Sequence, residues 1–103
     1  MAEIAELENS RFKVHTRPIM GQRGLIDHIV VINPYGLTEE LRADFLDRAR
    51  AIGDNITVKD GEVQFLAAHI SNYDLHTLGQ LIAEFTVRAL PVSGVLEVLR
   101  DYL

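Results

Sequence analysis

The chain has 103 residues, a formal net charge of −5 and no cysteine. The absence of cysteine excludes a disulfide framework, a thiolate metal site and a cysteine nucleophile. The acidic balance argues against nonspecific nucleic-acid binding as the main activity, because such a protein repels polyanions at long range.

The composition predicts one folded domain. Hydrophobic residues make up 48% of the chain and charged residues 24%, as in ordinary globular proteins, and the length suits a single core. We expect a tail or short helix over residues 1–10 and one α+β domain over residues 11–103. The first residues contain three glutamates and no basic segment before a long apolar run. They therefore predict neither a secretion signal nor a membrane span, and the default location is the cytoplasm.

A first strand is indicated by the alternation of apolar and polar residues that begins at Arg11, because a period of two is typical of a half-buried strand. We expect Pro18 to end this strand. A turn with two glycines over residues 20–24 then leads to an almost continuous apolar run over residues 25–32. That run predicts a central strand that is covered on both faces over residues 29–32.

Thr38 and Gly53 mark the ends of the first predicted helix, because threonine is a good N-cap and glycine is a common stop signal. A projection at about 100° per residue gives this helix one apolar face toward the sheet. That face consists of Leu37, Leu41, Phe45, Ala49 and Ile52. The same projection leaves Leu46 on the outer face among charged residues.

Asp60-Gly61 is the most specific local signal in the sequence, because this pair suits a two-residue type I′ turn in which both residues have positive φ. A hairpin with this turn has a fixed register, and every cross-strand pair in it is favourable. The register pairs Val58 with Val63, Thr57 with Gln64 and Lys59 with Glu62.

The second predicted helix spans about residues 74–90, with Ser71 or Asp74 as its cap and Pro91 after its end. Residues 75–83 contain no charged side chain, and apolar residues occupy two faces of this helix. We expect one face to lie on the sheet. The other face has to be covered by a final helix of the same chain or by a partner.

These elements follow the order ββαββαα and predict a two-layer α+β fold with a mainly antiparallel four-stranded sheet. Each of the two strand-to-helix turns carries a tyrosine, Tyr35 in the first and Tyr73 in the second. This similarity leaves open whether the two strand-turn-helix units arose by duplication or only share the same capping chemistry.

The sequence contains no catalytic motif, whereas the second helix has more apolar surface than one sheet face requires. Its small residues Gly79 and Ala83, four positions apart, permit the close approach of another helix. We therefore expect a non-catalytic protein-protein interaction or assembly module that works without a cofactor and forms a homodimer or binds another protein. The predicted interface consists of Leu46, Gly79, Ala83, Val87, Leu90, Tyr102 and Leu103.

The sequence is also compatible with two other functions. A regulatory protein could bind an anion or a nucleic acid through the basic first hairpin, with the two tyrosines beside a ligand. The candidate contacts are Arg11, Lys13, Arg17, Arg23, Tyr35 and Tyr73. A small enzyme could instead use His69, Asp74 and His76, which lie around one predicted strand end, as acid-base groups or metal ligands. Replacing Arg11, Lys13 and Arg17 by Gln is expected to leave the fold intact and, under the interaction hypothesis, to leave partner binding nearly intact.

Overall fold

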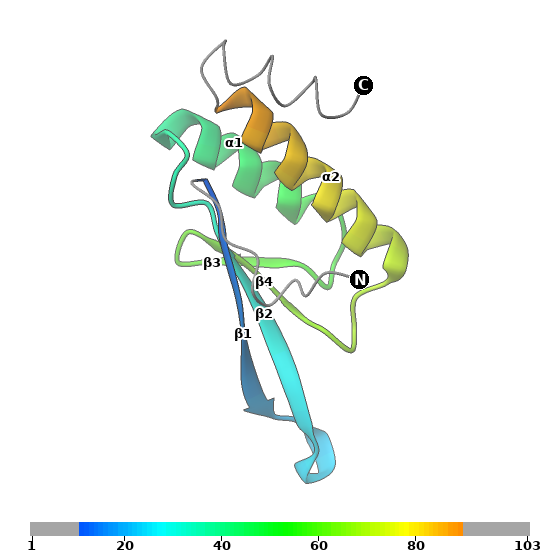
Figure 1. Cartoon of the computed structure of the whole chain (residues 1–103). Helices are drawn as coiled ribbons and strands as arrows, with labels where there is room; N and C mark the ends of the chain where they lie inside the picture. The colour runs from blue at the N-terminus through cyan, green and yellow to red at the C-terminus, as the bar shows by residue number, and fades with distance from the viewer. Residues whose placement is uncertain (1–10, 90–103) are drawn as a thin grey trace.

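The computed structural model describes residues 11–89, and the predictions for residues 1–10 and for the final helix lie outside this range. The described elements are β1 (Lys13–Met20), a short 3-10 helix (Gln22–Gly24), β2 (Ile26–Asn33), α1 (Glu39–Arg50), β3 (Thr57–Lys59), β4 (Glu62–Leu66) and α2 (Asn72–Arg88). The strands form one antiparallel sheet in the order β1-β2-β4-β3, and both helices cover the same face of it (Figure 1). The predicted two-layer α+β class is confirmed, as is the order ββαββα within the described range.

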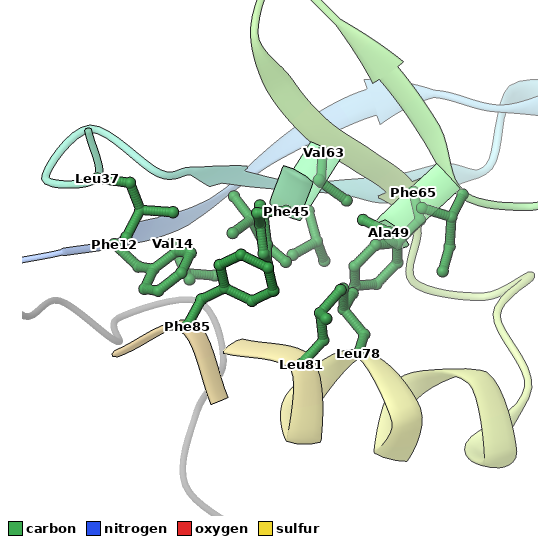
Figure 2. Packing of buried hydrophobic residues seen from close by; sticks show 13 residues of the cluster. Phe12, Val14, Leu37, Phe45, Ala49, Val63, Phe65, Leu78, Leu81 and Phe85 are labelled. Carbon is green, nitrogen blue, oxygen red and sulfur yellow. The ribbon is translucent and has the colours of Figure 1, made fainter. Parts of the chain in front are cut away.

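The core lies between the helices and the sheet face toward which alternate strand residues point (Figure 2). Three of the four phenylalanines in this core form a chain of ring contacts. The ring centroid of Phe45 lies 5.0 Å from that of Phe12 and 5.5 Å from that of Phe85, and both pairs are tilted as the aromatic quadrupole favours. Truncating a buried phenylalanine typically costs about 3–5 kcal/mol. This trio therefore fixes both helices to the start of the first hairpin.

The second half of the central strand β2 is covered on both faces, as its apolar run predicts, whereas its first residues are exposed or half-buried. Val30 and Ile32 belong to the core cluster under the helices. Val31 points to the opposite face and is nevertheless only 1% exposed. Its neighbours in the register are His15 on β1 and Gln64 on β4. The second face of the sheet therefore has an apolar centre between polar flanks.

The prediction that Pro18 ends β1 is wrong, because the strand continues past this residue. The Arg11 carbonyl accepts a hydrogen bond from the Gly36 N–H at 3.0 Å. At the other end, the Gly21 N–H donates to the Leu25 carbonyl at 2.7 Å. Odd-numbered residues of β1 thus direct their backbone groups toward β2. The missing N–H of Pro18 faces away from β2, where an edge strand needs no donor.

Both helices begin at side-chain caps, as predicted. Thr38 Oγ1 accepts the Leu41 N–H at 3.3 Å. Ser71 Oγ accepts the Asp74 N–H at 3.1 Å. Leu46, however, does not lie outside the fold but is partly buried and packs against the core cluster. Because α1 contacts both the sheet and α2, its buried arc is wider than a projection onto one surface assumes.

An ion-pair network joins α1 to α2 on their solvent side. Arg48 donates two hydrogen bonds to Glu84, one of them at 3.0 Å, and Arg88 pairs with Asp44 at 3.0 Å. Arg48 and Arg88 also lie over the ring of Phe85, at 5.4 and 4.4 Å from its centroid. The hydrogen bond from Arg48 lowers the pKa of the Glu84 carboxyl, and the same bond raises the pKa of Arg48.

The described chain consists of two ββα units, β1-β2-α1 and β3-β4-α2. Their second strands, β2 and β4, lie side by side and antiparallel in the centre of the sheet. The second hairpin has the predicted register, and Asp60 and Gly61 form its turn with φ of 56° and 76°. The two hairpins differ in length, because β1 and β2 have eight residues each whereas β3 has three and β4 has five.

Candidate functional site

The first hairpin extends past the end of the sheet. β4 pairs with β2 only over Ile29–Ile32, whereas β1 and β2 stay paired as far as Met20 and Ile26. Residues 18–28 therefore form a two-stranded arm, and no third strand of the described chain pairs with it. Figure 1 shows this arm pointing away from the helical layer.

Large apolar side chains stand in solvent at the end of the arm. Met20 is 74% exposed, and Leu25 and Ile26 are each 69% exposed. Met20 and Ile26 are register partners and share one face of the ribbon, while strand alternation directs Leu25 to the other face. Both faces of the arm are thus apolar. Soluble monomers seldom expose such surface unless it is a binding site.

A groove of about 730 Å³ separates the arm from the residues that follow β4. Its apolar lining consists of Ile19, Met20, Leu25, Ile26, Leu66 and Ala68. The groove exists because the chain turns away from β2 after Leu66. The Ala67 N–H still donates to the His28 carbonyl at 2.9 Å. Beyond that hydrogen bond the arm stands apart, and a concave apolar surface lies beside its convex end.

The backbone edges of the arm are poorly suited to pairing with another strand. On the β1 side, Pro18 lacks a donor. On the β2 side, the Asp27 carboxylate accepts the His28 N–H at 2.7 Å, and the His28 carbonyl is taken by Ala67. Such features protect exposed edges against strand addition. A partner of the arm therefore has to contact its side chains.

The arm is electrically balanced, in contrast to the rest of the chain. It contains one basic residue, Arg23, and one acidic residue, Asp27, whereas the whole chain has a net charge of −5. Arg23 and Gly24 both have positive φ, at 61° and 72°, and this left-handed pair makes the tight turn that ends the arm. Arg23 is exposed there.

The basic residues of the first hairpin lie in different places. The Arg11 guanidinium donates to the Ala89 carbonyl at 3.1 Å, so it supports the C-terminal end of α2. Lys13 Nζ lies 4.8 Å from the centroid of the Tyr35 ring. Arg23 stands at the far end of the arm. Arg11 and Arg23 therefore do not lie beside Lys13 on its face of β1.

Arg17 lines a hollow of about 390 Å³ on the sheet face opposite the helices. His15 and Lys59 share this hollow, but so do Asp60 and Glu62. Carboxylates on the same surface offset the basic charges and repel an anion. The hollow is therefore a mixed polar surface rather than a phosphate cradle.

Tyr35 and Tyr73 do not flank a common ligand site. Tyr35 follows β2 and Tyr73 follows β4, and these strands are antiparallel. The two loops therefore leave the sheet at opposite ends. Tyr35 is 42% exposed and Tyr73 is 79% exposed, so Tyr73 lies largely in solvent and Tyr35 only partly.

His69, Asp74 and His76 lie near each other in sequence but belong to different surroundings. The His69 carbonyl accepts a hydrogen bond from Asn55 at 3.0 Å, and His69 lines the groove beside the arm while His76 does not. Asp74 lies against Gly53, where an added Cβ would be 2.5 Å from its carboxylate oxygen. Within residues 11–89, no group of three or more metal-ligating side chains is placed to hold an ion.

The predicted interface on α2 is only partly described. Gly79 and Ala83 are exposed, and Val87 is partly buried; Leu90, Tyr102 and Leu103 lie outside the described residues. A Cβ added to Gly79 meets no described atom within 4 Å. An apolar hollow of about 120 Å³ lies beside Gly79, between α2 and the sheet.

The exposed apolar residues of the arm were not among the predicted site residues. Met20, Leu25 and Ile26 lie on either side of the two-glycine turn, and a continuous apolar run of this kind is typical of buried strands. The unequal length of the two hairpins is the sequence feature that indicates an exposed arm. This feature can be interpreted only when the pairing of β2 with β4 is known, because β4 covers only part of β2.

Comparisons with known proteins do not assign this chain to a class. It matches no protein-family model, and no curated protein or solved structure is significantly similar to it. Among the described helices, none is both long enough and apolar enough to cross a membrane. The geometry of the described residues is therefore the basis for the functional argument.

Proposed function

We propose that this protein is a non-catalytic protein-protein interaction module whose arm binds another protein chain. The observation that carries this proposal is the exposure of Met20, Leu25 and Ile26 at the end of a hairpin that leaves the sheet. Burial of one such side chain contributes about 1.5–3 kcal/mol. Three of them can therefore offset part of the several kcal/mol that association costs.

The second hairpin is an internal reference for the first. It holds the same position before its own helix, yet it ends at the two-residue turn Asp60-Gly61. A ββα unit of this fold can thus be completed without an extension. No residue of the arm belongs to the core cluster or packs against it. A segment that the core does not require, and that exposes apolar surface, is typical of a binding element.

The alternative functions receive less support from the described residues. Anion binding needs basic side chains that converge, whereas Arg11, Lys13 and Arg23 are directed to separate places. Acid-base catalysis by His69 and His76 needs both to face one site, and the groove that contains His69 does not contain His76. The proposal therefore rests on the arm and not on a polar cluster.

Photo-cross-linking in cells that produce the full chain tests the proposal. A photoreactive phenylalanine analogue is placed at Leu25 on the arm or, as a control, at Gln80 on α2, since both positions are exposed. We expect a protein adduct from position 25 and little adduct from position 80. Equal labelling at the two positions, or no adduct from position 25, would contradict the proposal.

A matched pair of variants distinguishes a specific contact from nonspecific hydrophobic binding. Met20→Ser with Ile26→Ser, introduced beside the photoreactive group, should abolish the adduct, because these two side chains make up one apolar face of the arm. Tyr73→Ser removes an apolar side chain of comparable exposure from the start of α2. We expect Tyr73→Ser to leave the adduct unchanged.

A further inference from the structure

We propose that the partner of the arm is a second copy of this chain, bound so that the arm of each copy lies in the groove of the other. This inference rests on the proposed function, because it names the partner of the same surface. Its structural basis is that the exposed apolar residues Met20, Leu25 and Ile26 also line one side of the groove, so that one surface both projects from the sheet and borders a hollow. A two-fold dimer requires such a surface, since each copy must both offer and receive the same contact.

The two halves of the contact match in chemistry. Met20 and Ile26 project from one face of the arm, and both are large, flexible or branched aliphatic groups. Leu66 and Ala68 form the wall of the groove across from the arm, and they are aliphatic as well. Neither half contributes a carboxylate or an ammonium group among these four residues. The groove lining also includes the Asp27 carboxylate, which accepts the His28 N–H, so the aliphatic contact lies beside a carboxylate that already has a hydrogen-bond partner.

The distribution of charge favours this mode of self-association. Two copies with a net charge of −5 each repel one another, but the arm itself contains one Arg and one Asp and is balanced. The acidic residues of α1, including Glu39, Glu40 and Asp47, lie on the opposite layer from the arm (Figure 1). Contact through the arms keeps these layers apart, and the Debye length at physiological salt is only about 8 Å.

The area of contact explains why both arm and groove are needed. Beyond the pair Arg17–Ile29, the hairpin has three more register pairs and a turn. Each pair adds about 3.3 Å of length to a ribbon about 10 Å wide, so one face of the arm covers roughly 150 Å². A stable interface buries about 800 Å² per partner. Arms that meet only at their ends fall short of this area, whereas arms that lie in each other's grooves bury both faces and both groove walls.

The blocked backbone edges limit the assembly to a closed pair. Pro18 on one edge and the Asp27–His28 contact on the other hinder the addition of further strands. Each groove is filled by one arm, and each arm occupies one groove. The arrangement therefore closes with two copies and leaves no free site for a third.

Sedimentation of the purified full chain from about 1 µM to 1 mM tests the inference, because this range spans the weak affinities typical of small interfaces. We expect a monomer–dimer equilibrium in the natural sequence. Leu25→Ser with Ile26→Ser should raise the dissociation constant at least about tenfold, since each exposed aliphatic side chain is worth more than a factor of ten when buried. Tyr73→Ser should change it less than about twofold, because an exposed residue outside the interface has little effect.

Cross-linking between differently labelled copies tests the geometry. The chain has no cysteine, so Ile26→Cys and Ala68→Cys chains each carry one thiol. When the two proteins are mixed and oxidised with copper phenanthroline, we expect a disulfide between Cys at position 26 of one copy and position 68 of the other. A mixture of Ile26→Cys with Tyr73→Cys should form little of the mixed product.

The outcomes of these experiments distinguish the proposed dimer from the proposed interaction module. A natural sequence that stays monomeric at the highest concentration overturns the dimer, as does a dimer that the Leu25→Ser, Ile26→Ser variant leaves unchanged. If position 25 then still labels a different protein in cells, the interaction module stands and only the identity of the partner is wrong. If position 25 labels no protein, both proposals fail.

Discussion

The role of Arg11 depends on the position of the C-terminal end of α2, which is distant in the sequence. Sequence alternation groups Arg11 with Lys13 and Arg17 as solvent-facing basic residues. In the structure its guanidinium donates to the Ala89 carbonyl, at the end of α2, and it is partly buried. A cation at this position interacts favourably with the free carbonyls of the last helical turn. The expectation that the fold is indifferent to all three residues therefore needs revision for Arg11.

We predict that Arg11→Gln lowers the free energy of unfolding by about 1 kcal/mol, through loss of a charged hydrogen bond at a helix end. Lys13→Gln and Arg17→Gln are the matched controls, because both side chains are exposed on β1. Urea denaturation of the three single variants makes the comparison. If all three variants unfold at the same urea concentration as the natural sequence, the contact with Ala89 has no energetic importance.

At the scale of elements, the two helices depend on each other through the pair Arg48–Glu84. The hydrogen bond from Arg48 lowers the pKa of the Glu84 carboxyl. A carboxyl whose folded-state pKa is lowered stabilises the fold above its ordinary pKa, about 4.3 for glutamate. That contribution is lost as the pH falls through the lowered pKa. Because the pair is exposed to solvent and salt, its contribution is small.

We predict that Glu84→Gln is less stable than the natural sequence at pH 7, and that the difference disappears when the pH is taken below the lowered pKa of Glu84. Thermal denaturation at a series of pH values measures this difference. Addition of salt at pH 7 should reduce it as well, because salt screens exposed ion pairs. A difference that persists unchanged in strong acid would mean that Gln acts through packing and not through charge.

A substitution at Gly79 tests the predicted helix-helix interface on α2. Glycine within a helix costs about 1 kcal/mol relative to alanine, and an added Cβ meets no described atom within 4 Å. We predict that Gly79→Ala raises the free energy of unfolding by about 0.5–1 kcal/mol. Urea denaturation measures the change. A loss of stability or of dimer formation would instead show that another helix packs closely on Gly79, as the small-residue spacing first indicates.

Local patterns predicted those elements whose structure depends on nearby residues. The caps Thr38 and Ser71 and the turn Asp60-Gly61 follow from chemistry within a few residues, and each is confirmed. The path of β1 through Pro18 was missed, because the tolerance of proline depends on the absence of a neighbouring strand. The partial burial of Leu46 was missed because it depends on the position of α2 beside α1.

The exposure of the candidate site depends on the pairing of strands that are still further apart in the sequence. Residues 25–32 read as one buried strand, and the second half of this run is indeed buried. Leu25 and Ile26 are exposed because β4 stops pairing before it reaches them. The end of β4 is set by residues far away in the sequence, so periodicity within the run cannot separate its buried half from its exposed half.

At the scale of the whole molecule, the difference between the two ββα units suggests a direct test of how much the arm contributes to stability. We predict that replacing residues 18–28 by Asp-Gly, the turn of the second hairpin, leaves the stability of the monomer within about 1 kcal/mol of the natural sequence. The new turn joins Arg17 to Ile29, which are register partners. Circular dichroism and thermal denaturation at low concentration measure the outcome. Loss of cooperative unfolding would show that the arm is part of the folding unit.

The trimmed chain should also lose all association, since it lacks the end of the arm and one wall of the groove. Sedimentation at high concentration checks this result. A trimmed chain that still forms dimers would transfer the interface to another surface, such as the exposed side of α2 around Gly79 and Ala83.

The antiparallel pairing of β2 with β4 also sets the order in which the chain can fold. Each hairpin closes across a short turn and needs only local contacts, which form quickly. The pairing of Val31 with Gln64 closes a loop of roughly 30 residues, and the entropy of that closure makes it the slow step. The arm takes no part in this pairing. Its length and sequence can therefore change from one variant to another without changing the rate at which the two halves of the sheet meet.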